Sequence, residues 1–325
     1  MIHEVLRRLA ATVLLIAALL TVVFVLVHLA PGDPVDLIVD PDLDDVGRAH
    51  LRTSLGLDRP LLEQYGTWIS GAVRGDFGRS LQRHRPVSEI IAEALPRTML
   101  LTGVAYAVHL TLALLLGVAL ATRRGSWFWR GVDVAGLVVY SLPAFWLALM
   151  LILVFARHLG WLPAGGMQDT SAMLGAESSW LDVARHLVLP VFVLGAASAM
   201  GTARFLRTSL LEILGSDHVM AARARGIPEG QVIRRHALRN VLLPVITLVG
   251  INLPALLGGA VVTETVFAWP GMGRVTVDAI FARDYPVVMA TTVLSGVLVV
   301  LANLLADLLY SRVDPRVRLG RRGAP

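Results

Sequence analysis

Six long stretches of the chain are apolar on all sides of a helix, a pattern typical of helices surrounded by lipid. Crossing the ~30 Å hydrocarbon layer of a membrane takes about 20 such residues. The stretches are residues 9–29, 99–121, 132–156, 187–206, 241–262 and 287–309. The first is longer than the apolar part of a cleaved signal peptide, so we interpret it as a membrane helix that stays in the protein. The pattern predicts an all-α, polytopic integral membrane protein with about six transmembrane helices.

Prolines and glycines interrupt these stretches. They are Pro143, Pro190, Pro244 and Pro254, together with Gly195, Gly201, Gly250, Gly258 and Gly259. Proline bends a helix because it lacks a backbone donor and crowds the preceding turn, and glycine lets helices approach closely. We expect most of these residues to serve ordinary bundle packing. Kinked, glycine-rich helices around a cavity also suit a transporter that rocks between two states.

Composition agrees with a lipid environment and sets the orientation. Only 16% of the residues are charged and the mean hydropathy is +0.67, whereas soluble domains are about 25% charged. Arginines concentrate in the loops that are inside if the N-terminus is cytoplasmic, and acids concentrate outside, as in the run from Asp33 to Asp45. The excess of basic residues in cytoplasmic loops therefore predicts that both termini are cytoplasmic. Because the basic charge is spread over four inner segments, it does not indicate nucleic-acid binding.

Two loops are too long to be simple connectors. The predicted organisation is an N-terminal transmembrane helix at 1–30, an extracytoplasmic helical lobe at 31–96, a transmembrane core at 97–310 that includes a cytoplasmic loop at 207–240, and a cytoplasmic arginine-rich tail at 311–325.

Two missing residue types exclude several enzyme classes. The chain has no lysine and no cysteine. A phosphate-binding P-loop and a Schiff-base enzyme both need a lysine. A thiol nucleophile or a thiolate metal site needs a cysteine. The histidines show no spacing typical of metal ligands, so we expect neither a metal site nor a cofactor bound by this chain.

The cytoplasmic loop predicts a short helix, a turn and a second helix. Ser216 or Asp217 suits the start of the first helix, Gly226 the position just after its end, and Pro228 the first turn of the second. The small side chains of the first helix would let a partner approach closely, and its arginines could pair with acidic groups there. The residues expected to form this contact are Ala221, Ala222, Arg223, Ala224, Arg225 and Gly226.

This loop resembles that of the inner-membrane permease subunits of ATP-binding-cassette importers. In that family an Ala-Ala pair is followed by a Gly four residues later and then by Ile and Leu-Pro. The matching residues are Ala221, Ala222, Gly226, Ile233, Leu243 and Pro244. Met220 stands where many members have Glu, but the Ala-Arg-Ala-x-Gly pattern here is common in the peptide-importer branch. The resemblance implies the type I ABC importer transmembrane fold and a coupling helix that docks on an ATPase subunit.

Motifs along the rest of the chain are similar to the dipeptide, oligopeptide and nickel branch, specifically its first permease with a longer outer loop. They are Pro31-Gly32-Asp33-Pro34, Leu55-Gly56-Leu57-Asp58-Arg59-Pro60, Gly75-Asp76-Phe77-Gly78-Arg79-Ser80, Glu264-Thr265-Val266-Phe267-Ala268-Trp269-Pro270-Gly271-Met272-Gly273 and Arg283-Asp284-Tyr285-Pro286.

The resemblance also implies partners and a substrate class. It implies ATPase subunits that bind ATP and Mg²⁺, a second homologous permease, an extracytoplasmic solute-binding protein, and a location in the bacterial inner membrane in contact with lipid. The expected function is peptide uptake. The same architecture would serve for nickel, haem, glutathione or a glycan, and those alternatives stay open at this point.

Charged and polar residues in the predicted spans are the remaining candidates for function, because lipid makes them costly. We expect Asp133, Arg204 and Asp307 to be structural, since they lie near span ends. His109 is expected to be a satisfied histidine of the bundle. Glu264, with Phe267 and Trp269 of the turn that follows it, is a candidate for the transport pathway or an outer gate.

Other functional classes fit less well. An intramembrane enzyme could use Ser198 or Ser295, but neither lies in a G-x-S-x-G motif, and no histidine stands one helical turn away in sequence. An ion-coupled secondary transporter would show inverted repeats and a relay of buried acids or histidines, which we do not find. A pure membrane scaffold would not need the coupling-loop motif.

Overall fold

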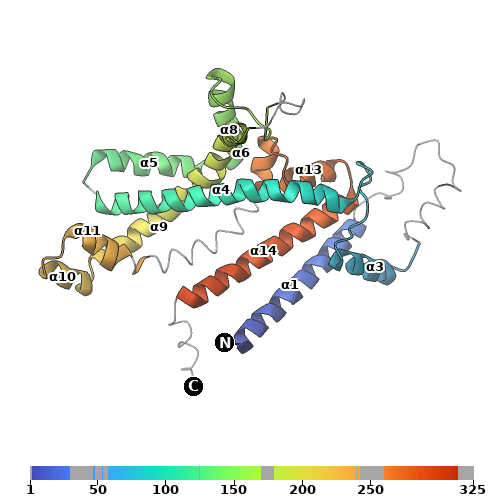
Figure 1. Cartoon of the computed structure of the whole chain (residues 1–325), viewed down its shortest axis with the longest axis horizontal. Coiled ribbons are helices and arrows are strands. Elements are labelled where there is room, and N and C mark those ends of the chain that lie inside the picture. The colour runs from blue at the N-terminus through green and yellow to red at the C-terminus, as the bar shows by residue number, and fades with distance from the viewer. Residues whose placement is uncertain are drawn as a thin grey trace. The chain divides into compact units, whose positions relative to one another are not determined.

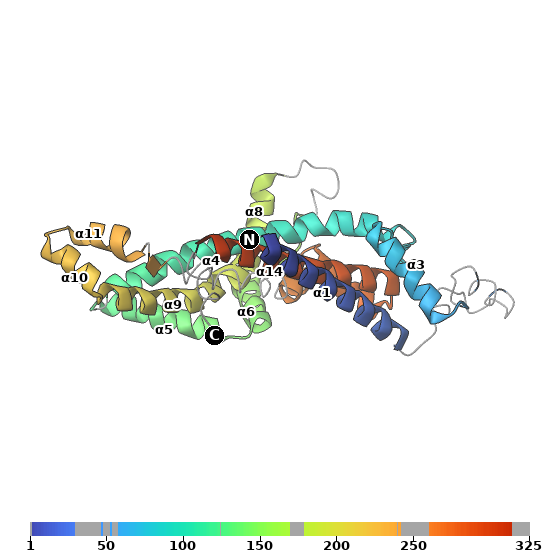
Figure 2. The same cartoon turned by 90° about the horizontal axis from the view of Figure 1, so that it is seen from below.

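The computed structural model describes residues 2–29, 47, 53, 58–123, 125–169, 179–238, 240–241 and 260–313. In this part of the chain all extended regular elements are helices, and the one β-bridge joins Arg79 to Pro86. Figures 1 and 2 show the helices from two directions, and the chain divides into two compact units. The first comprises Met1–Thr98 and Pro270–Val300, and the second Met99–Trp269 and Leu301–Pro325.

In the first unit, the helices α1 (Ile2–Leu29) and α14 (Tyr285–Val313) run side by side (Figure 1). Leu20, Val23 and Phe24 of α1 pack against Met289 and Val293 of α14. The short helix α3 (Leu61–Val73) closes this cluster with two aromatic side chains. The apolar stretch at 9–29 therefore forms a helix as predicted, and its buried face packs on protein.

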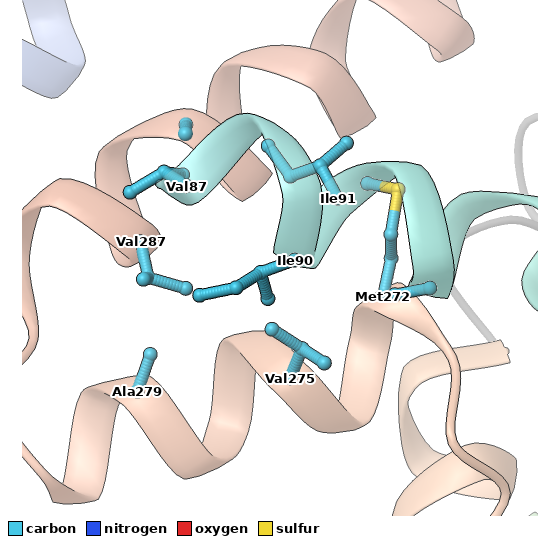
Figure 3. Packing of buried hydrophobic residues seen from close by; sticks show 9 residues of the cluster. Val87, Ile90, Ile91, Met272, Val275, Ala279 and Val287 are labelled. Carbon is cyan, nitrogen blue, oxygen red and sulfur yellow. The ribbon is translucent and has the colours of Figure 1, made fainter. Parts of the chain in front are cut away.

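Two more helices complete the first unit, and Figure 3 shows how they pack. The start of α4 (Val87–Thr122) lies over α13 (Met272–Phe281), with Ile90 of α4 between Val275 and Val287. The buried residues of α4 here recur at helical spacing: Val87, Ile90, Ile91 and Ala94. This periodicity explains why α4 begins ten residues before the predicted boundary at residue 97. Residues 87–96 thus belong to a helix that continues without a break past residue 97.

Two motifs that are far apart in the sequence meet in this unit. Asp284, just before α14, is buried and accepts hydrogen bonds from the Ser80 hydroxyl and from the backbone N–H of Leu81 at 3.1 Å. The hairpin that presents Ser80 is closed by a bond of 3.0 Å from its N–H to the carbonyl of Arg85. A buried carboxylate is stable only where donors surround it, and this hairpin supplies them.

The second unit contains the remainder of α4 and the helices up to residue 238. The helices α5 (Trp127–Ser141) and α6 (Ala144–Leu151), the latter continued by the π-helix η2 (Ile152–His158), correspond to the predicted span 132–156. The second arm is bent by 108° from the direction of the first. The break falls at Pro143, which takes an extended backbone (ψ 131°) and starts α6. The sequence predicted a kink at Pro143, but the size of the bend shows that residues 132–156 do not form one straight span.

A single helical run forms the centre of this unit. It consists of α8 (Trp180–Val191), the π-helix η3 (Phe192–Ala196) and α9 (Ala197–Leu214). Pro190 lies inside α8, and the wider π-helix follows it directly, as is common where proline disturbs the regular bonding of a helix. Gly195 lies in the π-helix, and a Cβ atom there would be 2.2 Å from the carbonyl oxygen of Ala105 on α4. Glycine at this position thus permits a backbone-to-backbone contact, as the sequence predicted.

The all-α membrane fold predicted from the sequence is confirmed. Within the described residues, three helical runs are long and apolar enough to cross a membrane, namely Val87–Thr122, Trp180–Leu214 and Tyr285–Leu304, and the bent pair from α5 to η2 adds a fourth. The first predicted span lies in α1, whose apolar part is Ala10–Leu26. The fifth, at 241–262, falls mostly outside the described residues, as do the arginine-rich tail and much of the stretch 31–57.

Replacing Asp284 by Ala should destabilise the first unit by about 1.5–3 kcal/mol, because the donors of the hairpin lose a charged acceptor. Chemical unfolding of the purified chain in detergent measures this loss. The control is Asp278→Ala, which removes a carboxylate that is 52% exposed on α13. Equal stability of the two variants would contradict the role of Asp284.

Replacing Gly195 by Ala should cost about 1–3 kcal/mol, because the added methyl group overlaps a backbone oxygen that cannot move freely. Thermal unfolding of the same preparation tests this. Gly103→Ala on α4 is the matched control, since a Cβ there meets no atom within 4 Å. If both variants unfold like the original chain, the close contact does not stabilise the fold.

Candidate functional site: the cytoplasmic loop

The loop after α9 folds as a helix, a turn and a second helical segment. The first helix, α10 (Asp217–Ala224), ends at Arg225, and Gly226 follows with a φ of +77°. A left-handed backbone of this kind favours glycine, so Gly226 ends the helix as predicted. The chain then enters α11 (Glu229–Gln231), which continues as the π-helix η4 (Val232–Ala237).

Ser216 stands at the start of α10 as predicted, and the caps of the loop differ from the prediction in two details. Ser216 occupies the position before α10, but its hydroxyl donates 2.5 Å back to the carbonyl of Ile213 and lies 2.9 Å from Nδ1 of His218, so it does not cap the helix. Pro228 precedes α11 and does not lie in its first turn.

The loop has a small hydrophobic core of its own. Val219 and Ala222 of α10 and Val232 of η4 have no exposed surface, and Ile213 and Leu214 at the end of α9 pack against them. The core therefore fixes α10 to α9. The two alanines of the predicted site therefore differ in burial: Ala222 points into the core and Ala221 is exposed.

Arg223 holds the turn closed. It donates to both carboxylate oxygens of Glu229, at 2.6 and 3.0 Å, and to the carbonyl of Leu214 at 3.1 Å. The guanidinium lowers the pKa of the Glu229 carboxyl, chiefly through the hydrogen bond between them. Arg223 therefore pairs within the loop, and pairing of the arginines with acidic groups of a partner stays a prediction. The sequence reasoning missed Glu229, although an acid six residues after the arginine, across Gly-Ile-Pro, could have indicated this bond.

The outward face of α10 is small-sided with one large apolar residue. Met220 is 52% exposed, and Ala221, Ala224 and Arg225 are exposed beside it. An exposed methionine is adaptable and favours protein contacts. A face of this composition, on a helix held rigidly by its own core, is suited to insertion into a groove of another protein.

The helix α9 is in turn fixed to its neighbours by charge and packing. Asp133 of α5 lies 3.2 Å from Arg204 and 2.7 Å from Arg207, both on α9. Leu206 and Leu210 are buried in a cluster that includes Ala121 of α4. The expectation that Asp133 and Arg204 are structural agrees with this pairing, and the side chain of Asp307 lies outside the described ones. Movement of α10 would therefore carry α9 with α5 and the end of α4.

The predicted outer-gate residues are all buried. Glu264, Phe267 and Trp269 have 0–1% of their surface exposed. The turn that contains them is closed by a bond of 2.8 Å from the Trp269 N–H to the Glu264 carbonyl. It packs against Gly165 and Gly166, whose N–H donates to the carbonyl of Phe267 at 2.8 Å. In this conformation none of the three lines an open path, and their role at a gate stays a prediction.

His109 lies beside Ser198 in space, although no histidine stands one helical turn from that serine in the sequence. Its Nδ1 is 2.9 Å from the Ser198 hydroxyl, and its Nε2 is 3.1 Å from the hydroxyl of Thr202. The serine hydroxyl donates its one proton to the Leu194 carbonyl at 2.8 Å or to that of Gly195 at 3.0 Å. Both ring nitrogens of the imidazole thus have a hydroxyl partner inside the bundle. His109 is a satisfied histidine of the bundle, as predicted.

A bundle of membrane helices with an exposed helix on its cytoplasmic loop is typical of a transport component. The chain belongs to the family described as binding-protein-dependent transport system inner membrane component, which matches residues 113–319. The N-terminal membrane component of the same systems matches residues 1–102. The chain is accordingly a multi-pass inner-membrane permease that works with an ATP-binding-cassette ATPase and a substrate-binding protein, and it is not itself an enzyme.

Curated relatives resemble the chain from end to end. The oligopeptide transport system permease protein AppB of Bacillus subtilis (strain 168) is 41% identical over 314 residues, covering 96% of this chain and 98% of AppB. The glutathione transport system permease protein GsiC of Salmonella choleraesuis (strain SC-B67) is 39% identical over 318 residues, covering 98% and 99%. A chain of the inward-facing MetNI methionine ABC transporter superposes with a TM-score of 0.55 at 22% identity, covering 69% of this chain and 96% of its own length, which supports the fold alone.

Replacing Glu229 by Gln should loosen the turn of the loop, because the charged bond to Arg223 is lost. The pair is exposed, so we expect amide hydrogen exchange at residues 224–228 to rise only about 1.5- to 5-fold, which corresponds to ~0.2–1 kcal/mol. Glu212→Gln, an exposed acid of α9, is the control.

The pH dependence of the same bond has a definite sign. Because the folded carboxyl pKa is lowered, the stabilisation is fully present above the ordinary carboxyl pKa and is lost as pH falls through the lowered value. The effect of Glu229→Gln on exchange should therefore be the same at pH 6 and pH 8. A difference that appears only above pH 7 would contradict the assignment to this carboxylate.

Proposed function

We propose that this chain is the first permease subunit of an importer for peptides, and that it forms the transport pathway with a second, homologous permease. The observation that carries the proposal is its end-to-end similarity to permeases named for oligopeptides and for glutathione. Glutathione is itself a tripeptide, so the two names share one chemical class. Uptake of glutathione is the second candidate, favoured by the similarity to GsiC.

In the proposed mechanism, separate ATPase subunits bind ATP and Mg²⁺, and α10 docks into one of them. The exposed Met220, Ala221, Ala224 and Arg225 would form the contact, and Ala222 and Arg223 would keep the helix in position. Closure of the ATPase pair would displace α10. Since α10 shares a core with the end of α9, the displacement would pass to α9 and its partners as one body. Packed helices that move together in this way are a usual means of switching a membrane bundle.

Substrate class is tested by uptake into whole cells. The gene is deleted in a strain without a redundant importer, and ATP-dependent uptake of a labelled dipeptide, a labelled pentapeptide and labelled glutathione is measured. Loss of at least one uptake, restored by the intact gene, supports the proposal and sets the length preference. Undiminished uptake of all three would overturn the peptide assignment and leave the family membership unchanged.

Replacing Gly226 by Val should abolish peptide uptake while ATP hydrolysis in membranes continues, because valine at a φ of +77° strains the turn that orients α10. We expect uptake to fall at least about tenfold at equal membrane levels of the protein, which corresponds to a loss of ~1.4 kcal/mol in coupling.

Gly230→Val is the matched control. It lies in the same loop, without a positive φ, and a Cβ there meets no atom within 4 Å. Full uptake by the Gly226→Val variant, or an equal loss in the Gly230→Val variant, would exclude this turn as the coupling element.

A further inference from the structure

A cluster of three side chains at the start of α8 has no part in the function described so far. Asp182 and His186 lie one turn apart on α8, and Asp169 comes from the segment that follows η2. The predicted orientation places them on the extracytoplasmic side, opposite to the coupling loop. One ligand atom from each residue can be chosen so that all three atoms lie within 4.8 Å of one another.

The histidine of the cluster has a defined tautomer. Its side chain is only 2% exposed. Its Nδ1 lies 2.9 Å from the backbone carbonyl oxygen of Asp182 and 3.3 Å from that residue's Oδ1. Oxygen atoms of both kinds only accept, so Nδ1 must carry the proton. In the neutral imidazole, Nε2 then presents a lone pair.

That lone pair faces a carboxylate. Nε2 of His186 is 3.8 Å from Oδ1 of Asp169, which is too far for a hydrogen bond. The backbone N–H of Asp169 donates to Oδ2 of Asp182 at 2.9 Å, so Asp169 is held in this position by its own main chain. A nearly buried lone pair opposite a carboxylate repels it unless a positive ion lies between them.

The arrangement has the features of a metal site. A metal-binding histidine commonly donates its other N–H to a carbonyl, which fixes the ring, as Nδ1 does here. With metal–ligand bonds of about 2.0–2.1 Å, tetrahedral ligands lie roughly 3.3–3.5 Å apart. The separation of 3.8 Å between Nε2 and Oδ1 needs only a small side-chain adjustment to meet this value. The two carboxylates balance the charge of a divalent ion.

We propose that Asp169, Asp182 and His186 bind a divalent first-row transition metal ion of the zinc type, with water at the remaining position. One imidazole with two carboxylates favours such an ion over calcium or magnesium, which prefer oxygen ligands alone. The ion would join the segment before Asp169 to α8. Gly166 of that segment also bonds the turn at Phe267, so the metal would stabilise the outer end of the second unit. The proposal does not depend on which substrate the importer carries.

The test uses the intact chain, purified in detergent through a tag without histidine and stripped of metal with a chelator. Zn²⁺ is the probe, and calorimetry gives stoichiometry and affinity. We expect one tight site per chain and a rise in the unfolding temperature with Zn²⁺. Asp169→Asn should weaken binding at least about tenfold. Because the Asp169 side chain is 68% exposed, this variant should fold normally. His186→Asn should abolish the site.

His158→Asn is the matched control. This exposed histidine is the last residue of η2, and its Nδ1 lies 2.7 Å from the carbonyl oxygen of Leu153, outside the proposed site. It should bind Zn²⁺ as the original chain does. Absence of a one-to-one site would overturn the proposal. Zinc binding by the Asp169→Asn and His186→Asn variants that equals binding by the original chain would also overturn it, since zinc would then bind elsewhere.

Discussion

Lipid hydrocarbon offers no hydrogen-bond partner, and this constraint decides how the helices of the chain are built. Where Pro143 cannot continue a helix, the chain turns by 108° and starts again. Where Pro190 interrupts the bonding of α8, a π-helix takes up the mismatch and then permits the close contact at Gly195. Inside the bundle, the imidazole of His109 finds two hydroxyl partners. Each irregularity thus keeps its polar groups satisfied within the protein.

The same constraint explains why several helices of the second unit are held together as one rigid block. A carboxylate such as that of Asp133 would cost much free energy if it lay unpaired among helices. Two arginines of α9 supply the opposite charge. The ion pairs and the cluster around Leu206 and Leu210 make α9 part of a block with α5 and the end of α4. On the cytoplasmic side, the small core of the loop attaches α10 to that block. A rigid connection of this kind is what a transporter needs if a movement outside the membrane is to change the helices inside it.

The sequence predicted those features that depend on local chemistry. Apolar runs located the helices, and the glycine and alanine pattern located α10 and its turn at Gly226. Features that depend on which distant groups meet could not be found in this way. The sequence does not distinguish Ala221 from Ala222. Only the packing against Val232 shows that Ala222 is the buried one. The start of α4 at Val87 depends on α13, nearly 200 residues later. The cluster of Asp169 with His186 was missed because its third member lies outside the helix that carries the other two.

The claim on which the account depends is that α10 contacts an ATPase subunit, and the composition of the chain allows a direct test. Since the chain has neither cysteine nor lysine, a single cysteine at Ala221 can be linked to lysines of a partner by a short thiol-to-amine reagent, without cross-links to lysines in the chain itself. A cysteine at Gly125, in the connection between α4 and α5, serves as the comparison. The account predicts that, in membranes active in import, Ala221→Cys links to the ATPase in a manner that changes with ATP, and much more than Gly125→Cys. No link from Ala221→Cys in such membranes, or a link equal to that from Gly125→Cys, would contradict it.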